Sequence, residues 1–164
     1  FFFFNLSEIK LSNKLKTIGD YAFYCCYNVM SITIPASVEE IGESAFAYLG
    51  NPLTVVSHIT EPFDIDKISF EQWGGDGDDP TLCVPYGSKA KYEALEGWSV
   101  FTTIIEIGDA DGDGSIDVND VTSTINHILN KPTASFFKGA ADMDGDGVID
   151  VNDVQGIIDR ALGK

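Results

Sequence analysis

Apolar residues recur with a period of 23 in the first part of the chain. Shifting residues 6–23 by 23 places them on residues 29–46 with the apolar positions in register. A third copy is expected from Leu53 with one residue inserted, which puts Val56 in the place of Ile32. One such unit cannot bury its own apolar face, so the pattern predicts a solenoid of stacked units. The matched pairs are Leu6 with Val29, Ile9 with Ile32, Leu11 with Ile34, Leu15 with Val38, Ile18 with Ile41, Ala22 with Ala45 and Phe23 with Phe46.

Each unit is expected to open with a short strand. Residues 31–34 alternate polar and β-branched side chains, which favours extended backbone, and Pro35 ends the run. Cys26 is interpreted as a small buried hydrophobe. Residues 1–5 align with 24–28, so the chain is expected to begin within a repeat and to be part of a longer protein; a disordered terminus is the alternative.

Residues 81–107 have the pattern of a solenoid cap. A strand is followed by an expected helix over residues 88–95, then by Trp98 and Phe101, then by a last strand over residues 103–107. A cap is needed because the open end of a solenoid would expose apolar core and a strand edge.

The distribution of charge indicates that the C-terminal part binds a cation. The whole chain has 10 Lys and Arg against 26 Asp and Glu, a net charge of −16, which argues against a nucleic-acid partner. Residues 108–164 hold 11 acidic and 4 basic side chains; the acids are all Asp, and ten of them are gathered in two short windows. Such clusters repel themselves unless a cation lies among them. Residues 76–79 (DGDD) lack a full ligand set and are expected to form a surface turn, with a third cation site as the alternative.

Two 12-residue segments place oxygen donors at the spacing that calcium requires. DADGDGSIDVND spans residues 109–120 and DMDGDGVIDVND spans residues 142–153. A curled loop offers ligands from positions 1, 3, 5, 7, 9 and 12, with Gly for the turn at position 6, here Gly114 and Gly147. So many carboxylates favour calcium over magnesium, and two ions are expected; a solvated acidic turn, or an ion that only stabilises the fold, are the alternatives. The expected ligands are Asp109, Asp111, Asp113, the Ser115 carbonyl, Asp117 and Asp120, then Asp142, Asp144, Asp146, the Val148 carbonyl, Asp150 and Asp153.

A helix is expected after each loop, over residues 121–130 and 154–162, where apolar residues share one face. No helical pattern precedes either loop. Position 12 is Asp in both loops, where the common EF-hand has Glu.

Catalytic and membrane-spanning residues are not predicted. His58 and His127 are the only histidines, and neither lies at a recognisable spacing from a nucleophile. Three cysteines have no zinc spacing, and no stretch of 18 apolar residues exists. We therefore expect a protein that is not an enzyme and has no transmembrane segment.

The segments SITIPASVEEIGESAF and KLKTIGDYAF resemble BspA-like leucine-rich repeats of bacterial surface proteins. Residues 81–107 resemble the terminal cap of such domains. The resemblance implies an α+β chain with residues 1–107 as an N-terminally incomplete leucine-rich-repeat solenoid with its C-terminal cap.

Residues 108–164 resemble a type I dockerin, since each half is a calcium loop followed by a helix. The resemblance implies a small all-α domain that binds a cohesin module through loop positions 10 and 11. In this chain those positions are Val118, Asn119, Val151 and Asn152, where well-known cellulosomal dockerins have Ser-Thr pairs.

Together the two resemblances predict a non-catalytic, extracellular adhesion or interaction protein, secreted or associated with the cell surface. A calcium-dependent dockerin would bind a cohesin and anchor the solenoid, whose ligand is unknown, in a cellulosome-like assembly linked to polysaccharide degradation. One alternative is the non-catalytic end of a larger glycoside hydrolase. The other is a rigid calcium-stabilised stalk, with the dockerin packed on its own solenoid.

Overall fold

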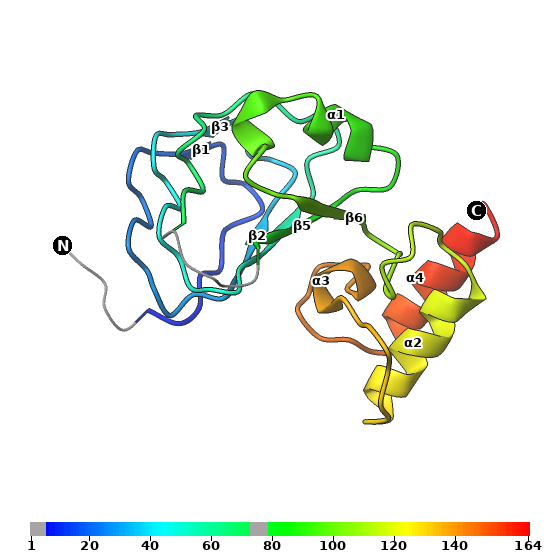
Figure 1. Ribbon diagram of the computed structural model, residues 1–164. Coiled ribbons are helices and arrows are strands. Elements are labelled where there is room, and N and C mark those ends of the chain that lie inside the picture. Colours follow the sequence, from blue (N-terminus) through cyan, green and yellow to red (C-terminus); the bar gives the residue numbers. More distant parts are fainter. Residues whose placement is uncertain (1–5, 73–78) are drawn as a thin grey trace. The chain divides into compact units, whose positions relative to one another are not determined.

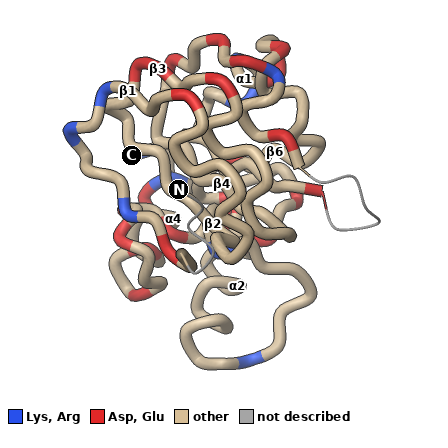
Figure 2. Tube along the Cα trace, turned by 90° about the vertical axis from the view of Figure 1, so that its left-hand side faces the viewer, with Lys and Arg blue, Asp and Glu red and all other residues tan. Residues whose placement is uncertain are grey.

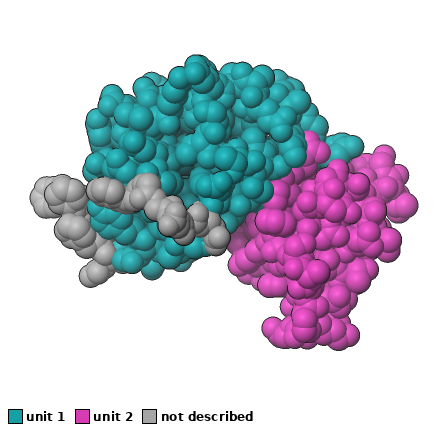
Figure 3. Space-filling model, in the orientation of Figure 1, with its two compact units in different colours: residues 1–104 teal, residues 105–164 magenta. Residues whose placement is uncertain are grey.

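A computed structural model describes residues 6–72 and 79–164 of the 164-residue chain. The chain divides into two compact units, Phe1–Ile104 and Ile105–Lys164 (Figures 1 and 3). The expected turn or cation site at residues 76–79 lies largely outside the described residues. None of the described helices is long and apolar enough to cross a membrane.

The first unit is a solenoid of short strands joined by turns (Figure 1). Four strands form one sheet in the order β2-β4-β5-β6, and β1 pairs with β3 in a two-stranded sheet. The pairs β1–β3, β2–β4 and β4–β5 are parallel, as stacked repeats require. The strands are β1 (Thr17–Ile18), β2 (Ser31–Ile34), β3 (Glu40–Ile41), β4 (Thr54–Ser57), β5 (Thr81–Val84) and β6 (Thr103–Glu106).

The strand register corrects the expected place of the inserted residue. Ile32 pairs with Val55, not Val56, so the 23-residue spacing continues into β4. After β4 the spacing lengthens. The Phe23 N–H donates to the carbonyl of Ala45, whereas the Phe46 N–H donates to that of Ser69, which is one residue further along the chain. The extra residue therefore lies after β4, where a turn accommodates it without breaking the strand pairing.

A stack of aromatic rings runs through the core. Phe46 is fully buried between Phe23 and Phe70, with ring centroids 5.5 and 4.9 Å away. Phe70 in turn contacts the cap residues Trp98 and Phe101 at 5.6 and 5.1 Å. Offset and edge contacts of this kind add to the free energy gained by burying the rings. Cys26 is also fully buried, which confirms its interpretation as a small hydrophobe.

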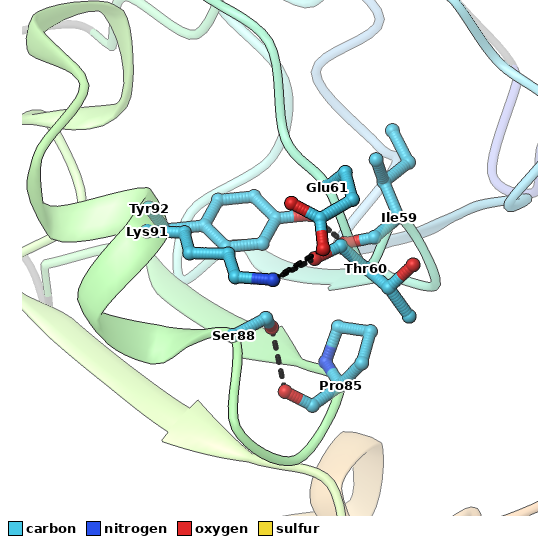
Figure 4. Close-up of polar contacts among 7 residues, drawn as sticks. All are labelled: Ile59, Thr60, Glu61, Pro85, Ser88, Lys91 and Tyr92. Atoms are coloured by element: carbon cyan, nitrogen blue, oxygen red, sulfur yellow. Dashed lines mark hydrogen bonds and ion pairs between the residues drawn. The ribbon is translucent and has the colours of Figure 1, made fainter.

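A buried hydrogen bond and an exposed ion pair join the cap to the repeats. Its helix α1 (Lys89–Glu93) is shorter than expected and is followed by the 3-10 turn η1 (Glu96–Trp98). The buried hydroxyl of Tyr92 donates to the Ile59 carbonyl at 2.9 Å, and Lys91 forms an ion pair with Glu61 (Figure 4). The Tyr92 bond satisfies a hydroxyl that burial would otherwise leave unpaired, whereas the Lys91–Glu61 pair is exposed to solvent and adds little to stability.

The second unit contains α2 (Val118–Ile128), α3 (Lys138–Ala141) and α4 (Val151–Ala161), and α2 packs against α4. Both long helices begin three residues earlier than the apolar pattern predicted, inside the loops. The short α3 precedes the second loop, so the expectation that no helix precedes either loop is wrong there. The chain is thus a solenoid followed by a small helical domain.

Candidate metal centre

The first aspartate of each loop organises the backbone around it. Asp109 accepts N–H bonds from Gly112 at 2.9 Å and from Gly114 at 3.1 Å. Asp142 accepts the equivalent pair from Gly145 at 2.8 Å and Gly147 at 2.9 Å. Every partner in one loop lies 33 residues from its counterpart in the other. The first half of each loop is therefore turned around its first aspartate in the same way.

Position 6 of each loop requires glycine. Gly114 and Gly147 have φ values of +90° and +88°, in the left-handed region that side chains with a Cβ rarely adopt. This turn reverses the chain and brings the aspartates on its two sides together.

The last aspartate of each loop joins the loop to its helix. Asp120 accepts from the Asp111 N–H at 3.1 Å and from the Asp117 N–H at 2.8 Å, and it is 1% exposed. Asp117 caps α2, because its side chain accepts from the Asn119 N–H at 2.6 Å. Asp117 and Asp120 thus form a capping box. Asp150 and Asp153 repeat this arrangement at α4.

Two groups of carboxylates could each hold a metal ion. Within each group, one oxygen from every residue lies within 4.8 Å of the others. The donors are all oxygens, as calcium prefers, so the residues present fit a calcium ion. The remaining expected ligands lie on the same loops but outside these groups. The groups are Asp109, Asp111 and Asp120 in the first loop, and Asp142, Asp144 and Asp146 in the second.

Without a bound cation, burial and mutual repulsion disfavour the ionised form of loop aspartates. Burial raises the pKa of Asp109, and the nearby Asp120 carboxylate raises it further, while the N–H groups of Gly114 and Gly112 act in the opposite direction. Burial also raises the pKa of Asp142 and of Asp111, against backbone hydrogen bonds that lower it. Asp and Glu are frequent along the rest of the trace as well, with few basic residues to offset them (Figure 2). When bound, calcium supplies the positive charge that favours ionised carboxylates.

The four expected partner-binding residues lie beside the metal groups at the first turns of α2 and α4. Val118 and Val151 are the first helical residues, with 70% and 72% of their surface exposed. Asn119 and Asn152 follow and are also exposed. The same exposed Val-Asn pair therefore stands at the start of the helix in both halves.

Three residues near the loops were not singled out from the sequence. Ser135 donates to the Asp111 carbonyl at 2.5 Å, and the Phe137 ring lies against Gly112. Lys138 donates to the Gly147 carbonyl at 2.9 Å. None of them belongs to the 12-residue pattern, so the spacing of ligands gives no sign of them.

Family comparisons agree with this architecture. Residues 1–72 match the model of the BspA type leucine rich repeat region, and residues 107–162 match that of the dockerin type I domain. The chain joins a BspA-type leucine-rich repeat region to a type I dockerin domain. No curated protein and no solved structure matches it.

Dockerin type I domains bind calcium, and the acidic groups lie within the part of the chain that matches this family. Both matched families are non-catalytic. Calcium binding and cohesin binding are properties of the dockerin family, whose model residues 107–162 match.

Proposed function

We propose that this chain is a non-catalytic extracellular protein whose dockerin, residues 108–164, binds two calcium ions and docks on a cohesin module. The solenoid with its cap, residues 1–107, would thereby be anchored in a multiprotein assembly, with polysaccharide degradation as the process it serves. Leucine-rich repeats of the BspA type and dockerins are typical of extracellular or surface proteins, which supports this location. The ions would be held by the twelve oxygen-bearing positions expected from the sequence.

The exposed first turns of α2 and α4 carry the proposal. Each presents a Val-Asn pair, and the two pairs lie 33 residues apart in halves that share their capping boxes and loop hydrogen bonds. Solvent-exposed apolar residues at matching places favour a protein partner with an apolar patch. The match also implies that the cohesin can bind in two orientations, through either half.

The test uses the full chain and a panel of cohesin modules, with affinity measured by calorimetry in calcium. Replacing Val118-Asn119 or Val151-Asn152 by Asp-Asp should each leave most of the affinity, and replacing both pairs should abolish binding. Tyr86→Ala is the control, because Tyr86 is also exposed but lies in the solenoid. Binding that survives the double replacement, or persists in chelator, would refute the proposal.

A further inference from the structure

The linker between α2 and the second loop braces the first loop. Ser135 Oγ donates to the Asp111 carbonyl at 2.5 Å, and the Phe137 N–H donates to the Ala110 carbonyl at 2.8 Å. The ring of Phe137 covers Gly112 so closely that a Cβ there would come within 2.3 Å of it. Phe136, next in the chain, stacks on His127 of α2 with ring centroids 4.2 Å apart. Loop one is therefore held in its folded shape by contacts outside the loop.

The second loop is instead contacted by a positively charged side chain, that of Lys138. The ammonium of Lys138, at the start of α3, donates to the carbonyl of Gly147 at 2.9 Å. Gly147 is position 6 of that loop; it directly follows Asp146 and lies three residues after Asp144. The residue that corresponds to Lys138 in the first half, 33 positions earlier, is Ile105, which has no charge. This difference breaks the symmetry of two loops whose glycine hydrogen bonds and capping boxes match.

We infer that the two calcium sites are unequal: loop one fills at lower calcium, and Lys138 sets the weaker affinity of loop two. The inference rests on the proposed calcium function and names its regulation. Bracing before binding raises affinity at loop one, because less conformational freedom is lost when the ion binds. A fixed positive charge near loop two lowers affinity there, because it repels a divalent cation and already neutralises part of the acidic charge.

The unequal sites give the dockerin two calcium thresholds. At intermediate calcium, only loop one is filled, so the first turn of α2 is fixed while that of α4 depends on a loop without its ion. The partner would then use the Val118-Asn119 half first. At higher calcium both halves become available, which changes the number of binding modes without a change in sequence.

A calcium titration of the full chain followed by NMR separates the two loops. The N–H groups of Gly114 and Gly147 donate to the first aspartates of their own loops at 3.1 and 2.9 Å, so each amide signal reports one site. In the unmodified chain the Gly114 signal should reach its midpoint at lower calcium than the Gly147 signal. Lys138→Gln should lower the Gly147 midpoint by roughly threefold to tenfold and leave that of Gly114 in place.

Two variants control for charge and folding. Lys131→Gln removes the same charge from an exposed linker residue and should move neither midpoint. Lys138→Arg keeps the charge and should preserve the order of filling. Coincident midpoints in the unmodified chain, or an equal shift of both signals in Lys138→Gln, would overturn the inference. If neither glycine signal responds to calcium, the proposed calcium function itself fails.

Discussion

The carboxylate of Asp120 accepts hydrogen bonds from the N–H groups of Asp111 and Asp117 at 3.1 and 2.8 Å. One bond closes the beginning of the loop and the other completes the capping box of α2. The same side chain is one of the three that could hold an ion in this loop. A single aspartate therefore connects the metal group, the loop backbone and the helix start. In the second half Asp153 accepts from the Asp150 N–H at 2.8 Å in the same way, but its other bond comes from the N–H of Met143, one position earlier in the loop than Asp111.

Asp120→Asn tests this role with little change in size. The amide has one oxygen and no charge, so we expect calcium affinity at loop one to fall by at least about tenfold. Ser115→Ala is the matched control, because Ser115 is expected to contribute its backbone carbonyl, which the substitution keeps. Calorimetry with calcium measures both variants. Equal losses in the two would show that the ligand assignment is wrong.

At the scale of elements, the apolar pattern predicted the solenoid strands but not the place of the extra residue. Val55 and Val56 are both buried, at 0% and 7% exposure, so either satisfies the pattern at the position of Ile32. Only the backbone pairing distinguishes them, and it joins Ile32 to Val55. The sequence analysis also did not identify Phe70 as the next ring of the aromatic stack. Phe70 lies 24 residues after Phe46, one more than the 23-residue period, because the extra residue falls between them.

In the calcium loops, the sequence predicted the acidic groups but not the helix starts or the contacts from outside the loops. Ligand spacing and glycine placement were sufficient to predict two acidic loops. The helix starts were placed three residues late because the residues between the ninth and twelfth positions were assigned to the loop alone. Aspartates at both positions also form capping boxes, which is a sequence signal that could have given the start. Contacts such as that of Lys138 with Gly147 depend on tertiary structure, and no local pattern predicts them.

Packing between α2 and α4 leaves one polar group unsatisfied. Thr124 is fully buried in α2, and its hydroxyl has no hydrogen-bond partner among the described residues. The residue 33 positions later, Ile157 of α4, is apolar and also fully buried. Thr124→Val keeps the shape and removes the unpaired hydroxyl, so it should stabilise the calcium-loaded dockerin by about 1 kcal/mol.

Thermal unfolding followed by circular dichroism measures this gain. Thr122→Val is the control, because Thr122 is exposed on the same helix and its hydroxyl donates to the Val118 carbonyl. It should not stabilise the domain. A loss of stability in Thr124→Val would mean that the hydroxyl has a partner, such as an ordered water molecule.

At the scale of the whole molecule, the two units have different sources of stability. The solenoid has a large apolar core with a continuous aromatic stack. The buried core of the dockerin is small and centred on Ala110, Ala141 and Ile157, between loops that gather most of its acidic charge. A small domain of this kind gains much of its folding free energy from bound metal. Removing calcium should therefore affect one unit and spare the other.

Two optical signals separate the units in the intact chain. The only tryptophans, Trp73 and Trp98, lie in the first unit, whereas the two longest helices, α2 and α4, lie in the second. Adding EDTA should reduce the helical circular dichroism signal strongly and leave tryptophan emission unchanged, and calcium should restore the signal. Phe46→Ala supplies the reciprocal comparison, because it removes a fully buried ring and should destabilise only the solenoid, by about 3–5 kcal/mol. A shift of tryptophan emission in EDTA would show that the units unfold together.

The capping boxes confine the variable part of the proposed surface to two adjacent residues in each half. Asp117 and Asp120 enclose Val118 and Asn119, and Asp150 and Asp153 enclose Val151 and Asn152. Replacing an enclosing aspartate removes a capping hydrogen bond and destabilises the helix start. The enclosed side chains are exposed, and one of them donates a hydrogen bond, from Asn152 Nδ2 to Asp150 Oδ2 at 3.4 Å. Mutation can therefore alter partner preference there at little cost in stability. The duplication has an evolutionary consequence. Substitutions in one Val-Asn pair can change which cohesin that half binds while the other half still binds the original cohesin. A protein of this kind could therefore change its partner without an intermediate that has lost cohesin binding.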